Sequence, residues 1–165
     1  MADAAAAIQE AGWREHGITN IIRAVAGQIG AVGGVALDFA SEDRELLRVV
    51  TDGLPSVETE FAEEMLDPTI VQPHITYSIT RADAHTICDY DLMSEREISK
   101  SPFYDWLQRA VGVKYFVGSR LNSGGPVVKL LGMHYEAKQG HASGQQIKRY
   151  KMLRPHIANA FGSHN

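Results

Sequence analysis

Residues 114–137 read KYFVGSRLNSGGPVVKLLGMHYEA, and they contain the clearest structural signal in the sequence. The segment from Lys114 to Asn122 is rich in aromatic and β-branched residues, which favour strands. Ser123 to Pro126 is a Gly- and Pro-containing turn signal, and Val127 to Ala137 has the composition of a second, longer strand. We therefore expect an antiparallel hairpin here.

Side chains along a strand point alternately to its two faces. In the second strand, alternation separates two sets of residues. One set holds Val127, Leu131, Met133 and Tyr135 with Lys129 as the exception, and the other holds Val128, Leu130, Gly132, His134 and Glu136. Periodicity does not decide which set faces the interior.

A second hairpin is predicted nearer the N-terminus. Val35, Leu37 and Phe39 alternate with smaller or polar residues, and the segment from Glu45 to Thr51 can return as the partner strand. The segment from Ile18 to Ile29 precedes it, and its apolar residues recur every three or four positions, which predicts a helix with one apolar face.

The middle of the chain is expected to be helical with interruptions. A helix should start near Leu54 to Ser56 and end before Asp67-Pro68, and residues 69–93 are expected to form a helix followed by a loop. Ser94 and Glu97 have the spacing of a capping box. A further helix, with Phe103, Trp106, Leu107 and Ala110 on its apolar face, should follow Pro102 and close near Gly112.

The last predicted helix starts at Ser143 and passes through Pro155, which should kink it without ending it. Its apolar seam is longer than a helix covering one sheet edge needs, so we expect a homodimer that uses this helix for assembly and signalling. The first helix, around Ile18 to Ile29, is a further candidate for this interface. The seam residues are Ile147, Tyr150, Leu153, Ile157, Ala160 and Phe161.

Together these elements predict an α+β fold in which an antiparallel sheet is covered by helices. The chain of 165 residues suits one domain, with an N-terminal helical segment at 1–30, a core at 31–140 and a C-terminal helix at 141–162. No apolar run reaches the roughly 20 residues of a membrane span, and residues 1–10 do not resemble a signal peptide. We expect a cytoplasmic protein with no membrane partner.

Charge is unevenly distributed along the chain. Residues 1–99 hold 6 Lys/Arg and 18 Asp/Glu, whereas residues 100–165 hold 10 and 2. Opposite charges mixed on one folded surface are the simplest interpretation, and a basic end that faces a polyanion is the other. The single cysteine, Cys88, excludes an internal disulfide and any multi-cysteine metal site.

The C-terminal part of the chain resembles the sensor region of LuxR-type transcriptional regulators, over roughly residues 50–161. The similar motifs are Ile98-Ser99-Lys100-Ser101-Pro102-Phe103-Tyr104-Asp105-Trp106-Leu107, the Gly112-Val113 strand opening, the Gly-rich hairpin and Leu153-Arg154-Pro155-His156-Ile157-Ala158-Asn159-Ala160. Asp67-Pro68 also lies where such sensors often have this pair. The resemblance implies a PAS- or GAF-like fold with a small-molecule pocket between sheet and helices.

The resemblance also implies a function. A small molecule, unidentified from the sequence, would bind and change the state of the C-terminal helix, which would signal to a DNA-binding domain. Only four residues follow Phe161, so we expect that helix-turn-helix domain to be absent from this chain, and DNA to be a partner only through it. Residue type and position single out four ligand-binding candidates: Tyr77, Tyr90, Trp106 and His134.

A small stand-alone enzyme or metal-binding protein is the alternative. His134 with His141, or His74 with His85, could meet through turns, but neither pair has the spacing of a local metal site. No nucleophile elbow or phosphate loop is present, so we expect no catalytic residues and no cofactor.

Overall fold

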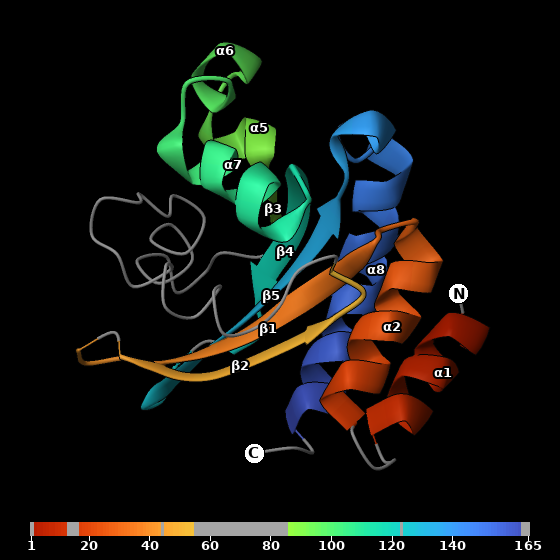
Figure 1. Ribbon diagram of the computed structural model, residues 1–165. Helices are drawn as coiled ribbons and strands as arrows, with labels where there is room; N and C mark the ends of the chain where they lie inside the picture. The colour runs from red at the N-terminus through yellow and green to blue at the C-terminus, as the bar shows by residue number, and fades with distance from the viewer. Residues whose placement is uncertain (1, 13–16, 44, 55–85, 123, 163–165) are drawn as a thin grey trace.

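The computed structural model describes residues 2–12, 17–43, 45–54, 86–122 and 124–162 (Figure 1). Helices α1 and α2 come first, two strands follow, and a short strand with three short helices precedes the C-terminal hairpin and the long helix α8. The bounds are α1 Ala2–Gly12, α2 Gly17–Ile29, β1 Gly33–Ala40, β2 Leu46–Asp52, β3 Thr86–Cys88, α5 Asp89–Leu92, α6 Glu95–Ile98, α7 Pro102–Trp106, η1 Leu107–Val111, β4 Tyr115–Arg120, β5 Val127–Tyr135, η2 Ala137–Gln139 and α8 Gly144–Gly162.

The five strands form one antiparallel sheet in the order β2-β1-β5-β4-β3. The two predicted hairpins therefore lie side by side, with β1 paired to β5 from Gly33–His134 to Ala40–Val127. The α+β prediction is confirmed, and the sheet is consistent with a PAS- or GAF-like domain.

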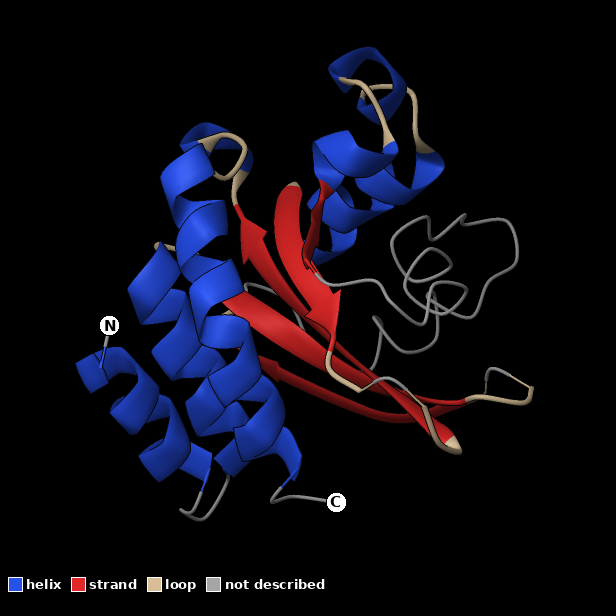
Figure 2. Cartoon of the chain, turned by 180° about the vertical axis from the view of Figure 1, so that it is seen from behind, coloured by secondary structure: helices blue, strands red, loops and turns tan. Residues whose placement is uncertain are grey.

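One face of the sheet, called here the α8 face, is covered by α1, α2 and α8 (Figure 2). Strand residues of one parity supply its core, and the three helices pack against them. The buried strand residues on this face are Ala36, Tyr115, Val117, Leu131, Met133 and Tyr135.

The opposite face, called here the α7 face, packs against α7 and η1. Its strand residues have the other parity: Val35, Leu37, Phe39, Val128 and Leu130. The two sets of β5 residues that alternation separated therefore lie on opposite faces of the sheet, and each set contributes buried residues to the core on its own face. The sheet is the middle layer of three, which is why periodicity alone gave no inward face.

Local signals in the sequence correspond to observed boundaries. Ser94 Oγ accepts a hydrogen bond from Glu97 N at 3.2 Å, which completes the predicted capping box. Gly112 ends the helical segment with φ of 85°, a left-handed conformation that favours glycine. Ser143 Oγ accepts from Gln146 N at 3.1 Å, as expected for the start of α8.

The prediction for residues 69–93 was wrong where the structure describes them. Residues 86–88 form strand β3, and Asp89–Leu92 form a helical turn where a loop was expected. β3 is three residues long and exists because it pairs with β4, an interaction that local propensity does not encode. The helix predicted from Leu54 to Asp67 lies largely outside the described residues.

Helix α8 continues through Pro155 to Gly162, as predicted. Its apolar seam is covered by this chain itself: Tyr150, Leu153 and Ile157 are fully buried against the sheet, α1 and α2, and Ile147 is partly buried against the same cluster. The argument that the seam exceeds what one sheet needs is therefore wrong, because two other helices also pack on it. The homodimer itself stays a prediction.

Two ion pairs join the acidic first part of the chain to the basic last part. Lys129 Nζ lies 3.4 Å from Asp38, and Lys114 Nζ lies 3.3 Å from Glu95. Opposite charges are thus mixed within the fold, as the simpler interpretation expected. None of the helices in the described ranges combines the length and the apolar character that crossing a bilayer requires.

Candidate functional site

The centre of the α7 face lacks side chains at two adjacent positions. Gly118 on β4 and Gly132 on β5 are register partners, and strand alternation places both on this face. Glycine inside a strand weakens it and often marks a position where backbone or ligand approaches closely. We call these two residues the glycine pair.

The two glycines have different surroundings. A Cβ at Gly118 would lie 2.4 Å from the carbonyl oxygen of Leu131, so the neighbouring backbone requires glycine there. Among the described residues, a Cβ at Gly132 would meet His134 Nε2 at 3.4 Å and Val35 Cγ1 at 3.8 Å, which are ordinary contacts. Packing against the described residues therefore does not explain why position 132 has no side chain.

His134 lies on the α7 face, two residues beyond Gly132, and is 5% exposed. Its ring is 6.4 Å from that of Phe116, the residue opposite it on β4. Burial lowers the pKa of His134 to about 4, so its imidazole is neutral at physiological pH. Its Nδ1 has no hydrogen-bond partner in the described part of the chain, which leaves one polar atom available on this face.

Arg120 lies on the same face, two residues beyond Gly118 on β4 and opposite Leu130. It is 6% exposed, and its Nε is buried with no hydrogen-bond partner among the described residues. A buried guanidinium and a buried imidazole thus flank the glycine pair from opposite ends.

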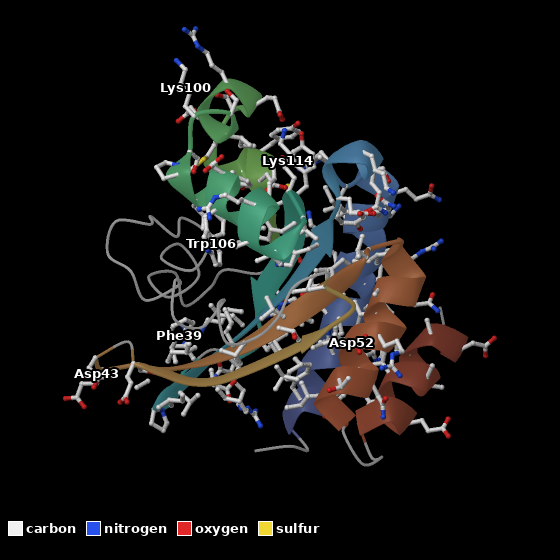
Figure 3. All side chains as sticks on the ribbon, viewed as in Figure 1. Phe39, Asp43, Asp52, Lys100, Trp106 and Lys114 are labelled. Atoms are coloured by element: carbon white, nitrogen blue, oxygen red, sulfur yellow. The ribbon has the colours of Figure 1, made fainter. Side chains whose placement is uncertain are left out.

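Trp106 covers this face from the side of α7. It ends the helix, is 1% exposed, and belongs to the same buried cluster as Phe39 and Leu130. Figure 3 labels Trp106 and Phe39, which lie on the same side of the sheet. Ser101 caps the start of α7, because its Oγ accepts a hydrogen bond from Tyr104 N at 3.4 Å, and the helix continues into the π-helical turn η1.

Two of the four predicted ligand-binding residues, Trp106 and His134, therefore share the α7 face. Tyr90 lies elsewhere: it is 49% exposed on α5, donates a hydrogen bond to Glu95 at 2.6 Å and stacks on His141 at 4.0 Å. Tyr77 lies outside the described residues. A role for Tyr77 or Tyr90 in ligand binding stays a prediction.

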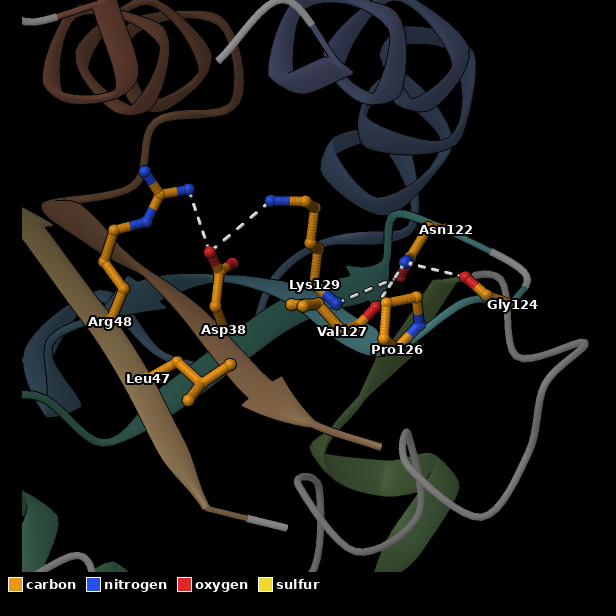
Figure 4. Close-up of a pocket in the computed structure, with 8 residues that line it drawn as sticks. All are labelled: Asp38, Leu47, Arg48, Asn122, Gly124, Pro126, Val127 and Lys129. Carbon is orange, nitrogen blue, oxygen red and sulfur yellow. Dashed lines mark hydrogen bonds and ion pairs between the residues drawn. The ribbon is translucent and has the colours of Figure 1, made fainter. Parts of the chain in front are cut away.

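A second candidate is an open pocket of about 490 Å³ at the end of the sheet that joins β1, β2 and β5 (Figure 4). Asp38 pairs there with Arg48 at 2.9 Å and with Lys129 at 3.4 Å. The Asn122 side chain bonds to three backbone groups, at Gly124, Val127 and Lys129. These polar side chains of the pocket are already bonded to other groups of the protein. The pocket is therefore the weaker candidate for a ligand site.

The histidine pairs considered for a metal site do not support one in the described structure. His134 lies on the α7 face, whereas His141 lies beside Asp89 and Tyr90. His74 and His85 are outside the described residues. Within the ranges that are described, no three His, Cys, Asp or Glu side chains come together as metal ligands.

Sequence reasoning missed Arg120 and the glycine pair. Their signals were present: Arg120 is a charged residue at the end of a largely aromatic and apolar strand, and Gly118 and Gly132 are isolated glycines inside two strands. Their common location became visible only through the β4–β5 register, which places the two glycines opposite each other.

The fold places this chain in a class of proteins, the α+β domains with an antiparallel sheet. Its sheet has buried polar groups on the α7 face, which is the face not covered by α1, α2 and α8. Among solved structures, the chain is similar to the crystal structure of the VqsR LBD domain from Pseudomonas aeruginosa, with a TM-score of 0.73 and 13% sequence identity. The alignment covers 98% of this chain and 94% of that chain, and it establishes the fold. No family model and no curated protein matches the sequence.

Proposed function

We propose that this chain is the ligand-sensing regulatory domain of a LuxR-type transcriptional regulator, and that it binds a small molecule on the α7 face. The observation that carries the proposal is the glycine pair, flanked by the buried polar side chains of Arg120 and His134 on the face of the sheet against which Trp106 packs. Apolar walls with a few convergent polar groups are what small-molecule sites require. The similarity to the domain of VqsR, a LuxR-type regulator, supports the same function.

Strand β4 provides a route from this face to α8. Ser119 and Tyr150 of α8 join their hydroxyl groups at 2.7 Å, and Arg154 of α8 donates to the carbonyl oxygen of Arg120 at 2.7 Å. The side chain of Arg120 faces α7, while its backbone is bonded to α8. A ligand that moves this side chain would therefore bias α8, which would relay the state to a DNA-binding domain outside this chain.

The remaining parts of the proposal follow from that role. The domain binds its ligand without catalysis, resides in the cytoplasm and contacts DNA only through the attached domain. A homodimer is proposed as the signalling unit. Because the α8 seam is buried in the monomer, exposed α8 residues such as Met152, which is 51% exposed, are the ones available to a second copy.

Native mass spectrometry of freshly purified protein tests ligand binding. We expect a bound small molecule that Gly132→Leu removes, because the new side chain would occupy the space above the sheet. Gly124→Leu is the matched control: nothing lies within 4 Å of a Cβ there, and the residue lines the open pocket instead. Retention of the molecule in Gly132→Leu, or its loss in Gly124→Leu, contradicts binding on the α7 face.

Thermal unfolding of both variants shows whether they fold. If Gly132→Leu unfolds, Gly132→Ala provides the second test, since a Cβ there makes only ordinary contacts. The smaller side chain should weaken binding without preventing folding.

A further inference from the structure

Arg120 is the only charged residue on the α7 face of the described strands. Its neighbours among the described strand residues of this face include Leu130 opposite it and Gly118 two residues before it, neither of which is polar. The acidic side chains of β1 and β2 point the other way: Asp38 pairs with Lys129, and Asp52 pairs with Arg23 of α2. None of the described strands therefore supplies a counter-charge to the guanidinium on this face.

No carboxylate of the described ranges forms an ion pair with Arg120. Arginine is seldom buried without a counter-charge, because a charge removed from water loses its hydration and must recover that free energy from a partner. The buried Nε of Arg120 has no hydrogen-bond partner among these residues. Such an arrangement costs stability, so its presence calls for a partner that the described chain does not supply.

We propose that the ligand is an organic acid with an apolar body, whose carboxylate pairs with Arg120. This inference rests on the proposed function and specifies its ligand class. The planar guanidinium has parallel N–H donors that match the two oxygens of a carboxylate. The apolar body would extend across Gly132 toward His134, where a Cβ would make only ordinary contacts with the described residues.

The location of Arg120 also explains how the acid would be sensed. The residue that binds the carboxylate through its side chain also accepts a hydrogen bond from Arg154 of α8 through its carbonyl oxygen. Pairing would hold the β4 backbone at the point where α8 is attached, so charge recognition and signal relay use one residue.

Matched probes test the charge requirement. Straight-chain carboxylates of six to ten carbons and the primary amides of the same length would be titrated by isothermal calorimetry at pH 7. We expect at least one carboxylate to bind about tenfold or more tightly than its amide, the size of effect that a charge-assisted hydrogen-bonded pair gives. Arg120→Met should abolish this preference, and Arg120→Lys should retain part of it.

The control is Arg48→Met, which removes an arginine from the open pocket and should leave the preference unchanged. Equal binding of carboxylate and amide, with both lost in Gly132→Leu, overturns the acid while the proposed function stands. No binding of any probe at millimolar concentration counts against both. A preference that persists in Arg120→Met places the carboxylate elsewhere and overturns the inference.

A second measurement needs no ligand. In protein whose native mass spectrum shows no bound molecule, Arg120→Met should raise the midpoint of thermal unfolding by about 2 °C or more, because it removes an uncompensated buried charge. Arg48→Met should not raise it, since Arg48 is paired with Asp38. A lower midpoint for Arg120→Met would mean that the chain itself supplies a counter-charge, and would overturn the inference.

Discussion

Tyr104 of α7 donates a hydrogen bond to Asp89 of α5, with 2.5 Å between the Tyr104 hydroxyl oxygen and Oδ1. Both residues are fully buried, and the other carboxylate oxygen of Asp89 accepts from Phe116 N at 2.9 Å. One carboxyl group thus connects α5, α7 and β4 at the end of the sheet where His134 lies opposite Phe116.

The first prediction concerns the pH dependence of stability. Burial raises the pKa of Asp89 to about 7, although the hydrogen bonds from Tyr104 and Phe116 oppose this change. Between about pH 4 and pH 7 the folded state retains a proton that the unfolded state has lost. The free energy of unfolding should therefore fall as pH rises through this window, by up to about 4 kcal/mol from this group.

Urea unfolding at several pH values measures this effect against Asp89→Asn. Because the Tyr104 hydroxyl can also accept a hydrogen bond, the asparagine should be tolerated, and this component of the pH dependence should disappear. His141, whose Nε2 is 3.6 Å from Asp89, has a pKa that burial lowers, so the comparison must be made between variants that retain it. Asp105→Asn, at an exposed position, is the control. An unchanged pH profile in Asp89→Asn would contradict the prediction.

The second prediction compares the two members of the glycine pair. Gly118→Ala should cost about 2 kcal/mol or more, because its Cβ would lie 2.4 Å from a backbone oxygen. Gly132→Ala should change the free energy of unfolding by less than about 1 kcal/mol, since its nearest neighbours are at contact distance. Chemical denaturation of both variants measures the difference, and equal costs would show that position 132 is as tightly packed as position 118.

The third prediction uses two adjacent residues of α8. Leu153 is fully buried, and Leu153→Glu should cost about 3 kcal/mol or more because it places a charge in the core. Met152→Glu, at a half-exposed position, should stay within about 0.5 kcal/mol. Unfolding curves and analytical ultracentrifugation are the measurements. A Leu153→Glu protein that is stable but dissociated from a dimer to a monomer would place the seam at an interface instead.

The fourth prediction concerns the contact between β4 and α8. Ser119→Ala and Tyr150→Phe should each cost about 1–2 kcal/mol, because either change leaves a buried hydroxyl unpaired. The double variant should cost less than the two single changes together. A double-mutant cycle measured by denaturation gives this coupling, and strict additivity would show that the two hydroxyl groups do not stabilise each other.

By itself, the sequence determined the elements whose signals are local. The two hairpins follow from alternation and turn residues, the start of α6 from the Ser94–Glu97 capping box, and the end of the π-helical turn from Gly112. These features depend on residues a few positions apart, so a single chain segment contains the information. Trp106 and His134 were selected by residue type, and the structure places both on the α7 face.

Only the tertiary structure decided which faces are covered and which residues meet. Strand β3 forms because β4 provides its hydrogen bonds, and the α8 seam is buried because α1, α2 and the sheet converge on it. The β4–β5 register places Gly118 opposite Gly132, and it places Arg120 and His134 on opposite sides of this glycine pair. These contacts join residues distant in the chain, and their free energy comes from burial and pairing that no local pattern records.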